Sequence, residues 1–357
     1  MIVNLGRMLL ARRNLMLMPF MALAPGVRAD SLSGDDPLPP GVTPAPIAER
    51  RVGLNFSIWF KPHAGPHHAW GTPLRGYYRS DDPAVFRDQA AEIASCGVDF
   101  LILDASNDTG SDIRTGQGTP EQLFEERVIA MIFEQLEAMA SPLKLVIMIG
   151  YPTLPDLFNG RLSAKADELH ALYVENPRHA ARLEYYRGKP LLIVYGLTPS
   201  PFHGGLPPWH DDRFTVRHMT SFLTQQPQLL GRAATGTEKV SRFGYWSWQD
   251  RQAPAYPIVD GHPEEMTLTA YWFPDGPPHG PAHKPGRGRD GGTTYLADWA
   301  RARRIGPKFA IAGTYNEWAV SEQRSPEMSK DLEPSVEFGY FYMQLLQRQV
   351  ALFKAGK

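Results

Sequence analysis

Beyond residue 50, short apolar runs alternate with longer segments in which apolar residues recur at helical spacing. Eight runs have the length and composition of β-strands, at residues 52–60, 98–104, 143–150, 190–196, 214–222, 243–250, 264–272 and 308–318. Helical spacing covers residues 82–96, 120–140, 166–186, 293–306 and 335–356. This order predicts an α/β protein, a single (β/α)8 TIM barrel over residues 51–357. An open doubly wound sheet is the alternative, but the sequence lacks the glycine-rich phosphate turn usual after its first strand.

The first 29 residues form a separate unit. Arg12 and Arg13 precede an apolar run over residues 15–26, which is followed by small residues. This order is typical of an export signal, and the run is too short for a stable membrane anchor. The arginine pair also resembles the twin-arginine export motif. We expect residues 1–29 to be removed, a flexible Pro/Gly/Asp-rich tether at residues 30–50, and a periplasmic or secreted protein without a membrane anchor.

Composition excludes several classes of protein. The 357 residues are 43% apolar and carry a formal net charge of −1, so the chain lacks the basic surplus of a nucleic-acid-binding protein. Cys96 is the only cysteine, which excludes an internal disulfide. The sequence has no nucleophile elbow, zinc-protease motif or P-loop. His63, His67 and His68 have no carboxylate nearby in the sequence, so we expect no metal and no cofactor.

Aromatic and polar residues gather at the carboxyl ends of the predicted strands, where a TIM barrel builds its active site. Aromatic rings stack on the C–H faces of sugars, and polar side chains pair with sugar hydroxyls. The rim therefore predicts a glycan substrate. The residues expected to bind it are Asn55, Trp59, His67, His68, Trp70, Asn107, Tyr195, His218, Trp246, Trp248, Asp250, Tyr271, Asn316 and Trp318.

Alternation along the first predicted strand indicates which side chains face the barrel interior. Leu54, Phe56 and Ile58 alternate with Asn55 and Trp59. Successive side chains of a strand point to opposite faces, so the apolar set is expected to face the helices. Asn55 and Trp59 are then expected to point inward.

Glu317 stands at the end of an otherwise apolar strand, where a carboxylate needs a partner or a function. Glycoside hydrolysis uses two carboxyl groups, one of which its surroundings keep protonated. Tyr315 and Trp318 flank Glu317, an environment that raises a carboxyl pKa. We predict Glu317 as the general acid/base, with Asp104 as its first candidate partner and Glu322 as the second.

Structural roles are the alternatives for both carboxylates. Glu317 could tie its strand end to an arginine or to loop amides. Asp104, beside Ser106 and Asn107, could organise its own turn.

The segment "YNEW" at Tyr315–Trp318 ends the eighth predicted strand and resembles the N-E-W segment of glycoside hydrolase family 99. That family comprises endo-α-mannosidases and endo-α-mannanases, and family 71 is related to it. The segments "GVDFLILDASN", "KPLLIVY" and "RGYYRSDDP" are similar to the wider family 71/99-like set, and the pattern spans Val52–Lys357. The resemblance implies a sugar-binding barrel, and with it an exported, endo-acting glycoside hydrolase.

One departure from the family bears on mechanism. In family 99 the tryptophan is followed by histidine and then a second catalytic glutamate, whereas here Ala319 and Val320 follow Trp318. Asp104, Glu322 or Glu333 could supply the missing carboxylate. A carbohydrate-binding barrel without catalytic activity is therefore the second functional hypothesis.

Overall fold

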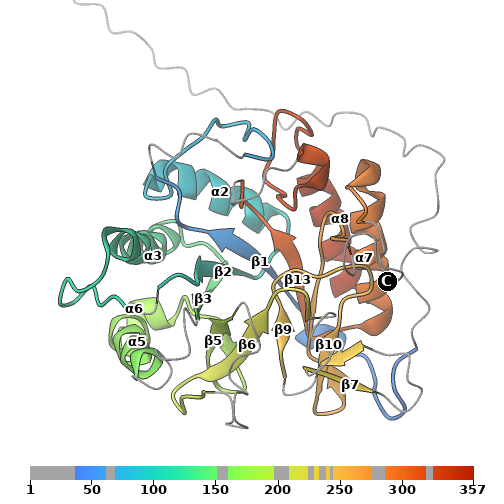
Figure 1. The fold of residues 1–357 in the computed structure, drawn as a ribbon, viewed down its shortest axis with the longest axis horizontal. Helices are drawn as coiled ribbons and strands as arrows, with labels where there is room; N and C mark the ends of the chain where they lie inside the picture. The colour runs from blue at the N-terminus through green and yellow to red at the C-terminus, as the bar shows by residue number, and fades with distance from the viewer. Residues whose placement is uncertain are drawn as a thin grey trace, which may run out of the picture.

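The computed structural model describes residues 37–61, 69–108, 110–150, 160–196, 209–223, 229–232, 239–241, 244–274, 286–318 and 325–357. Eight parallel strands form a nearly closed barrel with helices around it (Figure 1). In spatial order the strands are β12 (Glu265–Thr267), β13 (Phe309–Thr314), β1 (Arg51–Ser57), β2 (Phe100–Ala105), β3 (Lys144–Gly150), β5 (Lys189–Tyr195), β6 (Thr215–Thr220) and β9 (Trp246–Ser247). Each overlaps one of the eight predicted strand segments, and β1, β2 and β5 extend one residue beyond theirs, so the (β/α)8 prediction is confirmed.

The barrel closes through side chains where backbone pairing stops, between β9 and β12. The backbone N–H of Ser247 donates to Glu265 Oε2 at 3.3 Å. The Thr267 hydroxyl donates to the Ser247 carbonyl oxygen. These contacts join the two shortest strands of the barrel.

The helices are α2 (Pro83–Ser95), α3 (Pro120–Ala138), α5 (Arg161–Leu169), the π-helix η2 (His170–Val174), α6 (Pro177–Ala180), α7 (Thr293–Ile305) and α8 (Phe341–Lys354). Three short 3-10 helices are η1 (Ile47–Glu49), η6 (Asp290–Gly292) and η7 (Pro326–Met328). Local sequence sets the starts of the first two long helices. Asp82 caps α2, and Thr119 and Gln122 form a capping box on α3.

The single helix predicted over residues 166–186 is wrong. The chain there forms α5, η2 and α6 and then the short strand β4 (Tyr185–Tyr186), which pairs with β5. Pro177 starts α6 because proline lacks the N–H that would continue the preceding helix. The last predicted helix begins later than expected, at Phe341 rather than residue 335.

A second, four-stranded sheet was not predicted. Its order is β11 (His262–Pro263), β10 (Tyr256–Val259), β8 (Lys239–Ser241) and β7 (Leu230–Arg232). These strands are too short to give a periodic pattern.

Two apolar layers surround the strands. Phe100, Ile102 and Met148 belong to a cluster inside the barrel, whereas Leu54 and Phe56 belong to the cluster that includes helix residues. The amide of Asn55 donates to the Trp248 carbonyl, which lies across the barrel, at 3.4 Å. The predicted alternation of β1 is therefore confirmed.

The described end of the expected tether packs on the barrel. The Ala45 backbone N–H donates to the Gly306 carbonyl at 2.7 Å, and the Arg50 guanidinium donates to the Phe353 carbonyl at 3.2 Å. The ordered domain therefore begins before residue 51. Residues 1–36, with the predicted signal, lie outside the described residues. Within the described part of the chain, no helix has both the length and the apolar character needed to cross a membrane.

Candidate active site

A chain of hydrogen bonds follows the carboxyl-terminal rim of the barrel. The Tyr195 hydroxyl, at the end of β5, lies 2.7 Å from Ser221 Oγ. The Gln249 side-chain nitrogen lies 3.4 Å from the same Ser221 oxygen, and the Gln249 side-chain oxygen Oε1 accepts from Lys330 Nζ at 2.7 Å. Residues that follow β5, β6 and β9 are thus connected to one buried lysine.

Lys330 joins this chain to Glu317. Its Nζ lies 2.5 Å from Glu317 Oε2, and the two side chains are only 4% and 9% exposed. The same ammonium group lies 5.5 Å from the centre of the Trp248 ring, within cation–π distance. Glu317 was predicted to have an apolar setting, but its nearest charged neighbour is a cation. The sequence-based expectation of aromatic neighbours did not include this lysine.

Tyr315, one of those aromatic neighbours, faces away from the rim. Its ring stacks on Phe56 at 5.8 Å, and its hydroxyl donates to Glu92 Oε2 at 2.6 Å. Phe56 belongs to the layer between strands and helices. β13 ends at Thr314, so strand alternation does not govern Tyr315 and Glu317, and their side chains contact different partners.

Asp104 ends β2 on the same rim. Burial raises the pKa of its carboxyl, while hydrogen bonds from Ser106 and Trp59 and the positive charge of Lys330 oppose that rise. Burial also raises the pKa of Tyr195 to about 12, and the negative charges of Asp104 and Glu317 add to this effect. These mutual effects bring Asp104, Glu317, Lys330 and Tyr195 into one electrostatic site.

Asn316 fixes the position of Glu317. Its side-chain oxygen accepts from the Ser57 backbone N–H at 2.8 Å, and its amide donates to the Ser57 carbonyl at 3.1 Å and to the Tyr78 hydroxyl at 3.1 Å. The side chain thereby extends the pairing of β13 with β1 beyond the end of the strand. This clamp occupies the amide that was predicted to bind substrate.

Two polar atoms on β1 lie beneath the rim without partners. Asn55 Oδ1 and Ser57 Oγ are fully buried and have no hydrogen-bond partner among the described residues. Buried polar atoms without partners are costly, and such sites often hold water or a ligand. Among the described polar atoms, these two are best suited to form hydrogen bonds with a ligand hydroxyl.

Glu333 has a structural role. It accepts from the Tyr78 hydroxyl, Gln89 amide and Trp318 indole at 2.8, 2.8 and 2.5 Å, and pairs with Arg75 at 2.8 Å. Burial nevertheless raises its pKa to about 7. Because its oxygens are occupied by protein donors, Glu333 is a poor replacement for a second catalytic carboxylate. It holds Trp318 instead, which is 3% exposed.

Several predicted substrate-binding residues lie in the core. Trp246 is fully buried, donates to Glu264 Oε2 at 2.9 Å and packs 5.2 Å from Phe309 inside the barrel. His218 is also buried, its Nε2 lies 2.9 Å from the Trp209 carbonyl, and burial lowers its pKa to about 4. These two assignments are wrong because both side chains pack within the protein.

The remaining predicted residues divide by exposure. Trp70, Tyr271 and Asp250 are each 1% exposed. Trp59 is half-buried, and Asn107 is exposed on the loop after β2. His67, His68 and Glu322 lie outside the described residues.

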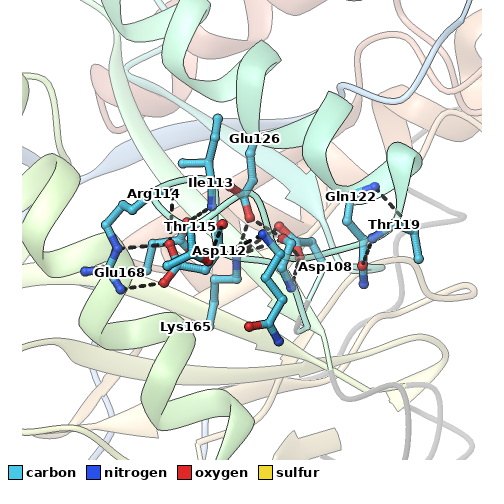
Figure 2. A network of polar contacts seen from close by, with 12 residues as sticks. Asp108, Asp112, Ile113, Arg114, Thr115, Thr119, Gln122, Glu126, Lys165 and Glu168 are labelled. Carbon is cyan, nitrogen blue, oxygen red and sulfur yellow. Dashed lines mark hydrogen bonds and ion pairs between the residues drawn. The ribbon is translucent and has the colours of Figure 1, made fainter.

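A buried charge cluster braces the loop after β2 (Figure 2). Lys165 Nζ, on α5, lies 3.1 Å from Asp108 Oδ2, 2.6 Å from Glu126 Oε1 and 2.6 Å from Glu168 Oε2. The hydroxyl of Ser111 donates to Asp108 and Glu126 and lies 3.1 Å from Lys165 Nζ. We call these five residues the Lys165 cluster. It ties the loop that leaves Asp104 to both α3 and α5.

Glu125, on α3, is close enough to both Asp104 and Asp108 for their charges to act on it. It is 4% exposed, and its Oε2 has no hydrogen-bond partner among the described residues. Burial raises its pKa to about 8, and the charges of Asp104 and Asp108 contribute to the rise. Burial therefore favours the protonated form of the Glu125 carboxyl.

In the described part of the chain, no group of His, Cys, Asp or Glu side chains has an arrangement suited to a metal ion. The three carboxylates of the Lys165 cluster surround an ammonium group instead.

No protein-family model matches the chain, and no curated protein matches it in sequence. Among solved structures it is similar to the GH99 endo-alpha-mannosidase of Bacteroides thetaiotaomicron in complex with BIS-TRIS-propane. The TM-score is 0.54 at 12% identity, over 86% of this chain and 98% of that one. A second structure of a GH99 endo-alpha-mannosidase from this organism gives 0.52 at 12% identity, over 86% and 98%. These similarities show a family 99-like barrel fold, and family membership stays a prediction.

Sequence reasoning missed Ser221, Gln249 and Lys330. Ser221 and Gln249 stand near the ends of predicted strands, so their position was a usable signal. Lys330 lies after η7, outside any predicted strand or helix, where neither periodicity nor a motif marks it.

Proposed function

We propose that this protein is an exported glycoside hydrolase that cleaves within a polysaccharide or oligosaccharide chain. The observation that carries the proposal is the buried Glu317–Lys330 pair at the carboxyl-terminal rim of a TIM barrel, together with a buried Asp104 on which the charge of Lys330 acts. Two carboxyl groups in unlike electrostatic settings are what glycoside hydrolysis requires.

The different electrostatic settings of Glu317 and Asp104 indicate different catalytic roles. Glu317 is paired with a cation, which favours its ionised form. The carboxyl of Asp104 has a raised pKa because it is buried. Asp104 is therefore the proposed general acid and Glu317 the proposed nucleophile or base. This reverses the order of roles expected from sequence.

In the proposed reaction, Asp104 transfers its proton to the glycosidic oxygen while the bond from that oxygen to the anomeric carbon breaks. The Glu317 carboxylate attacks that carbon or takes a proton from the attacking water. If Glu317 attacks, the Asp104 carboxylate then takes a proton from a water molecule whose oxygen displaces Glu317 from the anomeric carbon, which frees Glu317 and restores the acid. If Glu317 instead takes a proton from the attacking water, it releases that proton to solvent, and Asp104 takes one from solvent. Asn316 holds Glu317 in place through its contacts with Ser57.

Aromatic groups on the rim support a sugar as the ligand. Trp59 and Tyr195 are half-buried there, and Trp248 packs 6.0 Å from Tyr195. Asn55 Oδ1 and Ser57 Oγ lie beneath them as polar atoms without described partners. The similar GH99 structures add an analogy of fold.

A carbohydrate-binding barrel without turnover is the second candidate. The observation that favours it is the same ion pair, because a neutralised carboxylate is a weaker nucleophile or base. A binder would retain affinity for glycan and release no product.

The test is a screen of reducing-sugar release from α-mannan, α-glucan and bacterial exopolysaccharides. The wild-type protein is compared with Asp104→Asn and Glu317→Gln, together with binding of each glycan. If both substitutions abolish the release of reducing sugar, the result supports hydrolysis. Binding without release supports the second candidate, and neither binding nor release overturns both.

Export is proposed from the sequence of residues 1–29. The mature protein then begins near Asp30. N-terminal sequencing of the protein recovered outside the cytoplasm tests this, and an intact Met1 contradicts it.

A further inference from the structure

A groove of about 670 Å3 lies at the amino-terminal end of the barrel, opposite the candidate active site. The starts of β1, β3 and β13 and the β4–β5 hairpin form its walls. Its volume is within the range of about 300–1,000 Å3 typical of small-molecule sites. We call it the basal groove, and Arg51, Lys144, Tyr185, Arg187 and Lys308 are the lining residues used below.

A tight hairpin presents Tyr185 to this groove. Tyr186 pairs with Lys189, so the connecting turn consists of Arg187 and Gly188 alone. Their φ angles are 54° and 80°, as a type I′ turn requires. Arginine adopts such a φ at a cost, which often marks a functional position.

Tyr185 is 46% exposed, whereas its neighbour Tyr186 is 8% exposed. The Tyr186 ring is held between Lys308 and Arg217, at 5.1 and 5.2 Å from its centre. Tyr186 thus anchors the hairpin, and the Tyr185 ring is exposed at the groove. An exposed ring on a rigid turn is a suitable stacking surface for a sugar.

Charge in the groove favours an anion. The lining contains the cations Arg51, Lys144, Arg187 and Lys308 and the carboxylates Glu49 and Glu184. Arg51 pairs with Glu184 and Lys308 with Glu49, each at 2.6 Å. Two of the four cations take part in neither pair.

Lys144 and Arg187 are those two cations. Lys144 Nζ donates to the Ala181 carbonyl at 2.5 Å, and no described carboxylate lies within ion-pair distance of it. Arg187 has only a long contact to Asp260, at 3.4 Å, between side chains that are 49% and 72% exposed. Exposed ion pairs of this kind contribute little to stability, so Arg187 is available to a ligand. Lys144, which has no described ion-pair partner, is available as well.

We propose that the basal groove is a second carbohydrate site, which binds an acidic oligosaccharide. One sugar ring stacks on Tyr185, and a uronate carboxylate pairs with Lys144 and Arg187. A ring face beside two cations matches a ligand that combines C–H faces with negative charge. This inference goes beyond the proposed function, because it requires no turnover at the rim.

The test measures binding of oligogalacturonate by calorimetry at low salt. All proteins carry Glu317→Gln, so hydrolysis at the rim has no effect on the result. The groove variants are Tyr185→Ala, Lys144→Gln and Arg187→Asn. Arg187→Asn creates the Asn-Gly pair that type I′ turns prefer, and it therefore removes the charge while keeping the turn. Tyr340→Ala, at a similarly exposed tyrosine at the N-cap of α8, is the control.

We expect Tyr185→Ala and Arg187→Asn each to weaken binding by about tenfold or more, and Tyr340→Ala to leave it unchanged. Neutral malto-oligosaccharide of the same length and inorganic polyphosphate should bind more weakly than oligogalacturonate. The proposal is overturned if oligogalacturonate does not bind, if the groove variants bind as well as the control, or if either comparison ligand binds equally well.

Discussion

The ammonium group of Lys330 lies 2.5 Å from the Glu317 carboxylate, and both side chains are almost completely buried. A positive charge this close to a buried carboxylate favours the ionised form of Glu317. Lys330 therefore decides what Glu317 can do, because an ionised carboxylate can accept a proton or attack carbon but cannot donate a proton. Asp104, whose pKa burial raises, is the acid that we propose as its complement.

Lys330→Gln should move the acid limb of the pH–rate profile to higher pH. Without the ammonium group, the Glu317 carboxylate binds a proton more readily, so a larger fraction of the enzyme is inactive at low pH. We expect a shift of about one pH unit or more, measured as kcat/KM against pH.

Lys330→Arg is the matched control, because it keeps the positive charge. Its acid limb should stay near the wild-type position, even where altered geometry lowers the rate. A Lys330→Gln profile that keeps its shape and only falls in height contradicts an electrostatic role for Lys330.

Asp104→Asn and Glu317→Gln should each reduce kcat at least ~100-fold on the substrate that the screen identifies. Both changes preserve shape and remove proton exchange. Their stabilities should differ, because Glu317→Gln leaves Lys330 buried without this carboxylate and should lower the melting temperature. Steady-state kinetics and thermal unfolding measure the two effects. Activity retained in both variants rejects the assignment of these carboxylates.

The fold could be predicted from sequence because each barrel strand carries its own pattern. Runs such as residues 143–150 are apolar on both faces, as buried parallel strands are, and their number defines the barrel. The candidate site could be predicted from sequence only in part. Glu317 and Asp104 were found from their places at strand ends, but Lys330 comes from a loop whose path depends on tertiary packing.

Trp246 and Trp248 show a second limit of sequence reasoning. Both aromatic residues stand near the end of the same predicted strand, and both were expected to bind sugar. The described strand β9 is only two residues long, and Trp246 lies within it, bonded to Glu264. Depth along the barrel axis decides between core and rim, and local pattern does not give that depth.

Trp59→Ala and Trp246→Ala should therefore affect different properties, the first glycan binding and the second stability. Trp59 is half-buried at the rim, so its loss should weaken glycan binding by ~1–3 kcal/mol with little change in stability. Trp246 fills the barrel core, so its loss should reduce the free energy of unfolding by about 3–5 kcal/mol. Titration calorimetry and urea unfolding of both variants give the comparison. A stable Trp246→Ala protein with weakened binding would reverse our correction.

Glu125→Gln should stabilise the protein at high pH. The folded-state pKa of Glu125 is about 8, raised from an ordinary value of 4.5 by burial and by Asp104 and Asp108, with Lys61 opposing and Glu121 adding to the rise. Between these two pH values the folded chain binds more protons at this site than the unfolded chain. The site's contribution to stability is therefore present at low pH and is lost as pH rises toward 8.

The substitution removes this loss, because an amide does not ionise. Below about pH 4.5 the wild-type and variant proteins should be similarly stable, and near pH 8.5 the variant should be more stable by at least about 1 kcal/mol. Urea unfolding at both pH values measures the difference. Glu126→Gln is the neighbouring control, and it should destabilise the protein at high pH because Glu126 pairs with Lys165 at 2.6 Å. Equal stability of wild type and Glu125→Gln at both pH values would show that Glu125 ionises without cost, and would contradict its place as a buried acid behind Asp104.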